Sequence, residues 1–354
     1  MPVTLAQAQI NTQADVDYAV IDNLRRYSWL LDQIAFDDTV TPGTGGSSLT
    51  YGYTRLTAAR SAAFRQINAE YVAAEADRQR FSVELKPLGG SFSVDRVLSR
   101  LGASATNEVS FQMQQLLTAV RTRFQDELIN GDTAVDAAGF DGLDKSLTGQ
   151  ATEYLPVNEG ISTGYLDWTR GTIDTQAEAM AQLDIVDDFL SRIVPSHTGG
   201  GDSGAPGALP PGVKAILGNT RSITRVRALA RWAGIYTQTQ DDLGRQLEMY
   251  GPWVLMDLGD NAVGTAPIIP IETRDPDGAG AGGNITNLTD LYAASFGLDA
   301  LHGASVANQP IVQTFMPDFA LPGAVKTGEI EMGPVAAVLR NVKSCGVLRN
   351  VKVG

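Results

Sequence analysis

The stretch TNEVSFQMQQLLTAVRTRFQDELING, residues 106–131, decides the fold. Its apolar residues recur every three or four positions, which is one stripe of a helix with 3.6 residues per turn. They are Val109, Met113, Leu116, Leu117, Val120, Phe124, Leu128 and Ile129. The other face includes Gln114, Gln125 and Glu127, so we expect it to meet water or a polar partner. The pattern predicts a helix over residues 106–130, ended by Gly131.

Length and composition bound the class of protein. The chain has 354 residues and 43% hydrophobic residues, enough to bury a sizeable core in two or three lobes. Its net charge is −13, which argues against a coat that wraps nucleic acid with basic residues but permits a container that encloses it. No apolar run reaches the length of a membrane span, and the N-terminus has no secretion signal, so we expect a non-secreted protein.

No motif indicates catalysis or a cofactor. Cys345 is the single cysteine, so we expect a buried structural thiol. The two histidines, His197 and His302, lie in loop-like contexts and form no metal-binding pattern. The glycines of residues 278–283 fit a GxGxxG pattern, but no clear helix follows to receive a phosphate. We therefore expect neither enzymatic activity nor a cofactor, and a cytosolic nucleotide-binding α/β enzyme stays an alternative.

The first hundred residues indicate an arm and a β-rich excursion. Residues 14–34 have a short helical pattern and lead into a Pro/Gly-rich connector at 41–46. Alternating residues predict half-buried strands at 49–54, 81–85 and 92–94, with Gly89-Gly90 as the reversal or bend between the last two. The alanine-rich segment 57–79 between the first two strands is compatible with a partial helix or with an extended loop.

The rest of the chain mixes helices and strands. Apolar stripes predict helices at 174–193 and 220–232. The expected strands are 215–219, 253–258, 266–271, 290–297, 335–340 and 347–353. We therefore expect residues 151–317 to form a mixed lobe of helices and strands.

Two motifs resemble a known family. FQDELINGD, residues 124–132, followed by GFDGLDKSL, residues 139–147, resembles the long "spine" helix and turn of the major capsid proteins of tailed bacteriophages. LYAASFG, residues 291–297, is similar to a strand of the same family. The order of arm, β excursion, long helix and mixed lobe also matches, so the resemblance covers nearly the whole chain.

This resemblance implies a phage capsid fold of the Hong Kong 97 type, in the α+β class. The expected parts are an N-terminal arm, an extended β loop, a peripheral domain with the spine helix at residues 106–130, and an axial domain. Their expected ranges are 1–45 for the arm, 46–98 for the extended loop, 99–150 with 318–354 for the peripheral domain, and 151–317 for the axial domain.

The resemblance also implies a structural role. Copies of the chain would associate into hexamers and pentamers and close into an icosahedral shell around double-stranded DNA, in a virion assembled in the host cytoplasm. Scaffold and portal proteins would be further partners, and neither a membrane nor sequence-specific DNA binding is expected. A bacterial encapsulin compartment, which has the same fold, is the main alternative.

Some members of the family join subunits covalently through a lysine of the extended loop and an asparagine of a neighbour. Lys86 is the only lysine in residues 1–98, and Asn308, Asn341 and Asn350 are candidate partners. Lys86, Gly89, Gly90, Asn341 and Asn350 are therefore the residues that we expect at a contact or crosslink between subunits.

Overall fold

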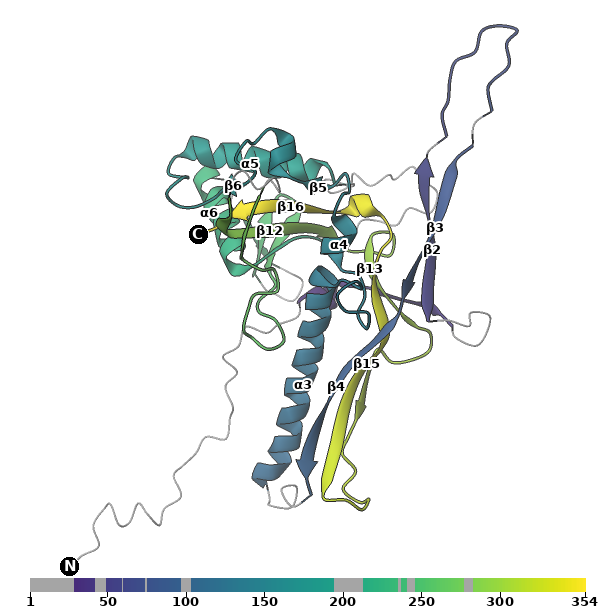
Figure 1. Cartoon of the computed structure of the whole chain (residues 1–354), viewed down its shortest axis with the longest axis vertical. Helices are drawn as coiled ribbons and strands as arrows, with labels where there is room; N and C mark the ends of the chain where they lie inside the picture. Colours follow the sequence, from purple (N-terminus) through teal and green to yellow (C-terminus); the bar gives the residue numbers. More distant parts are fainter. Residues whose placement is uncertain are drawn as a thin grey trace, which may run out of the picture.

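The structure is a computed structural model that describes residues 29–41, 49–58, 60–73, 75–96, 103–193, 213–234, 237–240, 246–276 and 283–354. A mixed lobe lies at one end of a long helix and its accompanying β ribbon, and a thin hairpin projects from the side (Figure 1). Most of the predicted arm and the linker lie outside the described residues, as do His197 and most of the glycine-rich segment 278–283.

The long helix is α3, Ala103–Asn130, which confirms the prediction from residues 106–131. Its C-terminal half is fully buried at Phe124, Leu128 and Ile129, whereas residues 109–119 are only partly buried or exposed. Of the two alternatives for the polar face of α3, Gln125 and Glu127 show the second: both are buried and do not face water. The Gln125 side chain donates from Nε2 to the carbonyl oxygen of Leu258 at 2.8 Å, so the mixed lobe supplies the polar partner.

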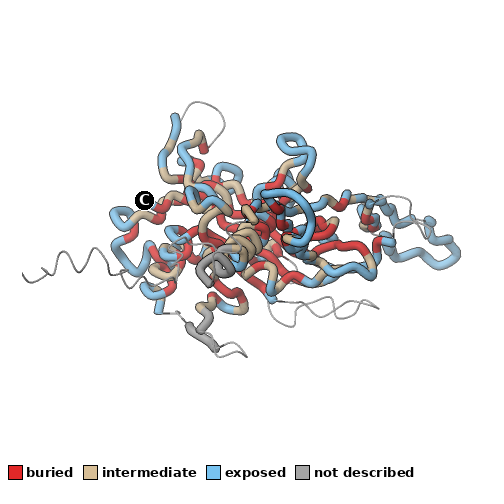
Figure 2. The backbone as a smooth tube through the Cα atoms, turned by 90° about the horizontal axis from the view of Figure 1, so that it is seen from below, coloured by how far each residue is buried: buried red, intermediate tan, exposed pale blue. Residues whose placement is uncertain are grey.

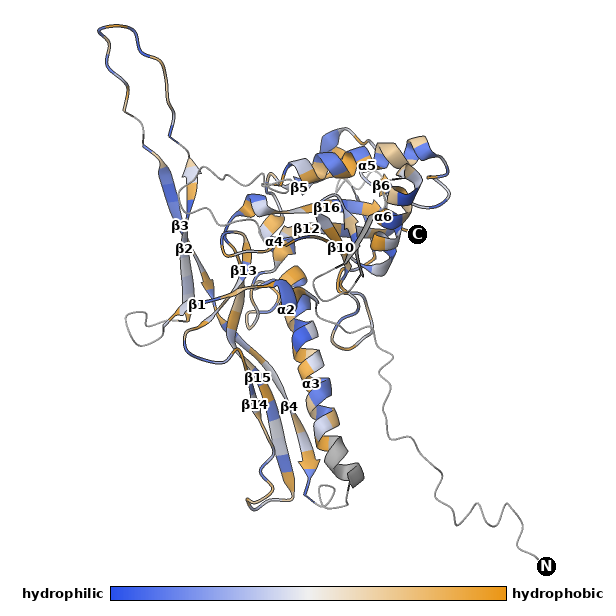
Figure 3. Ribbon diagram, turned by 180° about the vertical axis from the view of Figure 1, so that it is seen from behind, coloured by the Kyte–Doolittle hydropathy of each residue, from blue (hydrophilic) through white to orange (hydrophobic). Residues whose placement is uncertain are grey.

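A β ribbon runs beside α3, which Figure 3 shows from behind. Strand β4, Lys86–Asp95, pairs antiparallel with β15, Val325–Leu339, over nearly its whole length. They belong to a five-stranded sheet with β1 (Phe36–Val40), β13 (Leu301–Val306) and β14 (Val312–Phe315). A short helix, α2 (Trp29–Gln33), buries Leu30 in the same core.

Gly89 and Gly90 do not form the predicted reversal, because β4 runs straight through them. A Cβ on Gly89 would lie 2.5 Å from the Ile330 carbonyl oxygen, and one on Gly90 would lie 2.7 Å from Leu116 Cδ1. These glycines therefore let β4 approach its partner strand and α3 closely, and they do not turn the chain.

The reversal lies instead between β2, Thr50–Ala58, and β3, Asp77–Glu84, which form a separate two-stranded sheet. Their register runs from Thr50 opposite Glu84 to Ala58 opposite Asp77. Of the two alternatives for residues 57–79, the described residues show the extended one: strand ends and a long connecting loop with no helix.

A nine-stranded sheet forms the mixed lobe, with the order β5-β16-β12-β7-β10-β9-β8, β6 beside β16 and β11 beside β12. Its strands are β5 (Glu153–Tyr154), β6 (Leu166–Asp167), β7 (Lys214–Gly218), β8 (Thr237–Gln240), β9 (Gln246–Tyr250), β10 (Trp253–Asp257), β11 (Glu272–Arg274), β12 (Ile285–Ser295) and β16 (Cys345–Lys352). The short helices around it are α4 (Leu143–Leu147), η2 (Pro156–Glu159) and η3 (Val342–Ser344).

Two longer helices pack their apolar sides into a single cluster with residues of this sheet. They are α5, Gln176–Ser191, and α6, Thr220–Ala233, close to the predicted ranges. Thr175 and Glu178 form a capping box at the start of α5, and the Asn219 side chain caps α6 by accepting from Ser222 N at 2.9 Å. Buried residues therefore run continuously through the lobe (Figure 2).

Three expectations about strands are wrong. Residues 266–271 form no strand, because Pro267 and Pro270 lack amide donors; only a single bridge joins Asp260 to Pro267. His302 lies in strand β13, fully buried, and not in a loop. Residues 36–38 begin β1, which pairs parallel with β13, and do not simply lead into the connector.

The expected domain boundaries remain predictions, but two strands differ from them in sheet membership. Strand β16 was expected in the peripheral part, and it pairs with β12 in the nine-stranded sheet. Strand β13 was expected in the axial part, and it pairs with β15 in the five-stranded sheet. The chain crosses between the two sheets more often than the ranges imply, because strands far apart in sequence complete each sheet.

Candidate assembly surfaces

The base of the hairpin formed by β2 and β3 is fixed to the body. Tyr53 donates from its hydroxyl to the Leu339 carbonyl oxygen at 3.3 Å, and Tyr51 donates to Asp37 Oδ2 at 2.9 Å. Arg55 donates to the carbonyl oxygens of Leu339 and Arg340, and its guanidinium lies 4.4 Å from the centroid of the Phe81 ring. These contacts hold the direction in which the hairpin leaves the body.

The described residues 60–73 in the outer part of the hairpin are all exposed (Figure 2). Its apolar side chains are nevertheless large: Ile67 is 92% exposed and Val72 is 94% exposed, and Phe64 and Tyr71 are exposed beside them. Scattered exposed apolar residues are normal, but several on one slender projection indicate a surface that is covered in an assembly. We call Phe64, Ile67, Tyr71 and Val72 the hairpin tip.

Lys86 lies where the hairpin joins β4. Its Nζ is 2.8 Å from Glu84 Oε2, and this contact lowers the pKa of the Glu84 carboxyl. Lys86 also lines a cavity of about 470 Å³ between the hairpin base and the loop that follows α3, where Phe140 and Asp141 form part of the wall. Its position at the root of the projecting hairpin makes it available to a neighbouring molecule.

The candidate asparagines lie in different surroundings. Asn341 is exposed, and its side chain accepts from Lys343 N at 3.0 Å at the start of η3. Asn308 is also exposed, directly after β13. Asn350 is 5% exposed in β16, in the nine-stranded sheet, whereas Lys86 lies in the five-stranded sheet. The structure thus brings Lys86, Gly89 and Gly90 together on β4 but does not bring Asn350 to them.

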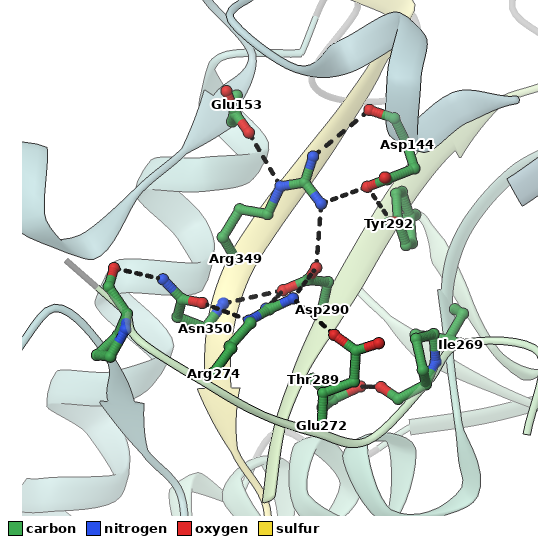
Figure 4. Close-up of polar contacts among 12 residues, drawn as sticks. Asp144, Glu153, Ile269, Glu272, Arg274, Thr289, Asp290, Tyr292, Arg349 and Asn350 are labelled. Atoms are coloured by element: carbon green, nitrogen blue, oxygen red, sulfur yellow. Dashed lines mark hydrogen bonds and ion pairs between the residues drawn. The ribbon is translucent and has the colours of Figure 1, made fainter. Parts of the chain in front are cut away.

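Sequence reasoning missed a network of charged groups inside the lobe (Figure 4). Arg349 Nε lies 2.9 Å from Glu153 Oε1, and Arg349 also contacts Asp144 and Asp290. These carboxylates hold the pKa of the Arg349 guanidinium above its ordinary value although burial opposes this. Glu153 and Asp144 come from the segment after the spine helix, so the network fastens that segment to the sheet.

A second arginine completes the network. Arg274 donates to both carboxylate oxygens of Asp290 and, from Nε, to Asn350 Oδ1 at 2.9 Å. Asn350 in turn donates to the Pro276 carbonyl oxygen at 2.9 Å and to that of Gly164 at 3.3 Å. Asn350 is a positioning residue inside its own subunit. The role of Asn350 depends on the pairing of strands that are distant in sequence. No local sequence pattern could therefore have predicted it.

The described residues offer little that is typical of an enzyme. They contain no group of three or more His, Cys, Asp or Glu side chains arranged to hold a metal ion. Cys345 is completely buried, and burial raises the pKa of its thiol to about 11, so it is a poor nucleophile. Within the same residues, no helix is both long enough and apolar enough to cross a membrane.

Comparison with known proteins identifies the fold. No family model and no curated protein sequence matches the chain. The holo-SrpI encapsulin complex from Synechococcus elongatus PCC 7942 matches with a TM-score of 0.59 at 14% identity, over 100% of this chain and 97% of that chain. The capsid of a native GTA particle matches with a TM-score of 0.57 at 11% identity, over 98% of this chain and 97% of the other. A chain from Mycobacterium phage Bobi matches with a TM-score of 0.53 at 12% identity, over 99% of both.

Identities this low establish the fold alone. The matches extend over essentially the full length of each chain, including the long helix and the projecting hairpin, so they do not reflect a shared substructure. The chain has the Hong Kong 97-type fold of phage capsid and encapsulin shell proteins.

Proposed function

We propose that this protein is a major capsid protein, whose copies assemble into hexamers and pentamers and close into an icosahedral shell around a double-stranded phage genome. The observation that carries this proposal is the hairpin: its base is fixed to the body, and its apolar tip is exposed in the single subunit. The matching shell proteins give the proposal its context.

A two-stranded hairpin gains little stability by itself in water. This one extends several large apolar side chains into solvent, where each loses the stabilisation of burial, about 1.5–3 kcal/mol for a fully buried side chain. Contact with a second copy would bury these side chains and recover that stabilisation. If the tip covers a different part of the neighbouring copy, the contact is heterologous, and repeating it generates a ring when the rotation between copies closes.

The remaining elements of the proposal follow from a shell role. The chain would be a component of the virion, assembled in the host cytoplasm with scaffold and portal proteins as partners. The closed shell would confine the DNA without sequence-specific contacts, which is consistent with the net charge of −13 on the chain. The proposed function is self-assembly, which requires no catalytic residue or cofactor.

An encapsulin-type compartment is the second candidate, favoured by the match to the encapsulin complex. Both candidates predict closed particles, and the contents differ. A phage capsid loaded in its host contains DNA, whereas a compartment contains protein. The ratio of absorbance at 260 and 280 nm of particles purified from the native source separates them.

Light scattering on size-separated protein tests self-assembly through the hairpin. We expect the wild-type preparation to contain particles of megadalton mass. The F64S/I67S/V72S variant should stay monomeric but keep the circular dichroism spectrum of the folded subunit, because these side chains are almost fully exposed within the subunit. The R60S/Q66S/E70S variant changes three polar residues of the same projection and is the matched control. If both triple variants assemble like the wild type, the hairpin tip is not an assembly surface.

A further inference from the structure

The two helices that cover the nine-stranded sheet present opposite charges to solvent. Helices α5 and α6 contact each other, and their buried sides share one apolar cluster (Figure 1). Their exposed sides therefore lie next to each other on the surface of the lobe. The exposed side of α5 is acidic, and that of α6 is basic.

The exposed side of α6 is a stripe of arginines. Arg221, Arg225 and Arg231 lie on one face of the helix by their spacing, and α6 contains no acidic residue. Among the described residues, none of these three guanidinium groups has a carboxylate within 4.0 Å, and Arg225 has only a long hydrogen bond to the Val353 carbonyl oxygen, at 3.4 Å. Trp232 lies on the same face and is 49% exposed. We call these four residues the α6 face.

The exposed side of α5 mirrors this pattern. Asp184, Asp187 and Asp188 lie on one face, with Met180 one turn before Asp184 and 51% exposed. Asp188 pairs with Arg192 at 3.0 Å, and Asp187 accepts a hydrogen bond from the Tyr250 hydroxyl at 2.7 Å. We call Met180 and the three aspartates the α5 face.

The two faces do not satisfy each other within one subunit. Of the ion pairs between described residues, none links an aspartate of α5 to an arginine of α6. Each face also has one large, half-exposed apolar side chain among its charges. An apolar anchor surrounded by charges is typical of surfaces that bind protein, and tryptophan and arginine dominate the energy of such contacts.

We propose that the α6 face docks on the α5 face of a second copy of this chain, as a head-to-tail contact within the ring. This inference rests on the proposed assembly and names the surfaces that join its subunits. The charges are complementary, and the contact is heterologous, as closure of a ring requires.

A polyanion fits the arginine stripe less well than a second copy does. DNA laid along α6 would approach the aspartates of the adjacent α5, and the chain as a whole carries a charge of −13. A second copy instead brings its own acidic face to the arginines. The aspartates of α5 then pair with arginines of another copy, so they favour the contact and do not oppose it.

Charge reversal tests the contact, with circular dichroism to confirm folding. The R225E/R231E variant has two acidic faces and the D184R/D188R variant has two basic faces, so each alone should stay unassembled. Mixed in equal amounts, they should form rings of six, because alternating subunits pair correctly, but not rings of five, because an odd ring cannot alternate. A chain with all four substitutions should regain both kinds of ring.

The R170E/K343E variant changes the net charge by the same amount as R225E/R231E at two other exposed positions and should assemble normally. Assembly of R225E/R231E alone, or loss of bound nucleic acid with rings intact, would overturn the docking proposal. If the wild type forms no rings, the proposed function itself fails. If the wild type forms rings and the mixture does not, only the docking proposal fails.

Discussion

Arg349 Nη1 lies 3.0 Å from Asp290 Oδ2, which joins strand β16 to strand β12 at the centre of the charged network. The Asp290 side chain is 8% exposed and that of Arg349 is 12% exposed, so both charges are largely removed from water. Because Arg349 also binds Asp144 and Glu153, one side chain connects the sheet to the segment that follows the spine helix.

Replacing Arg349 should therefore be costly. In R349M the Glu153 carboxylate, which is 9% exposed, loses its cationic partner, whereas Asp290 keeps Arg274 and the half-exposed Asp144 keeps Tyr292. Breaking a buried pair typically costs about 3–5 kcal/mol. The free energy of unfolding of the unassembled subunit, measured by urea denaturation, should fall by that amount. R192M is the control, because the Arg192 pairs are more exposed and surface pairs contribute below about 1 kcal/mol. Equal losses in the two variants would refute a stabilising role for the network.

Gly89 should not tolerate a side chain. In G89A the new Cβ meets the Ile330 carbonyl oxygen at 2.5 Å, and backbone cannot move aside as a side chain can. We expect a loss of about 1–3 kcal/mol in stability, as for other overpacked sites. G171A places a Cβ where no heavy atom lies within 4 Å, and it should leave the melting temperature unchanged. Equal melting temperatures for G89A and wild type would show that the two strands can separate locally.

His302 should make the subunit less stable in acid. Burial lowers the pKa of His302 below its ordinary value of 6.5, against the opposing effect of the Asp37 carboxylate. Below pH 6.5 the unfolded chain thus binds the proton more readily than the folded one. This contribution to stability is complete above pH 6.5 and is lost as the pH falls below it, by at most about 1.4 kcal/mol per pH unit.

Denaturation of unassembled subunits between pH 7 and pH 5 measures this effect. H302Q should show a shallower dependence of stability on pH than the wild type, whatever its absolute stability. The other histidine, His197, is present in both proteins, so the difference between their slopes belongs to residue 302. Identical slopes in the two proteins would contradict a lowered pKa of His302.

A covalent link through Lys86 remains a prediction. If assembled shells are crosslinked, boiling in detergent should leave bands above the monomer on a gel, and K86R should abolish them because a guanidinium cannot form the amide bond. Asn341 and Asn308 are the accessible asparagines, so N341D and N308D identify the partner. Only monomer from wild-type shells would exclude the link.

The sequence predicted best what is local and periodic. Helices α3, α5 and α6 were found because one apolar stripe determines each, and the Gly131 stop is close to the observed end of α3 at Asn130. The exposed hairpin was expected at its place in the chain, although its turn was assigned to Gly89-Gly90. A pair of glycines indicates either a turn or a close contact, and only the partner strand distinguishes the two.

Contacts between distant residues could not be predicted. Arg349 and Asp144 are separated by 205 positions, and nothing near either residue indicates the other. The buried state of Gln125 depends on Leu258, which belongs to the lobe and not to the helix. Strand β16 joined a sheet different from the expected one because strand pairing, unlike helix formation, is set by residues elsewhere in the chain.

Electron microscopy of the purified wild-type protein tests the central claim most directly. Negatively stained particles from the leading size-exclusion peak should be closed shells in which rings of six and rings of five are both visible. A uniform population of monomers or dimers, at concentrations and salt conditions that favour association and with scaffold protein supplied, would contradict the claim that this chain builds a shell.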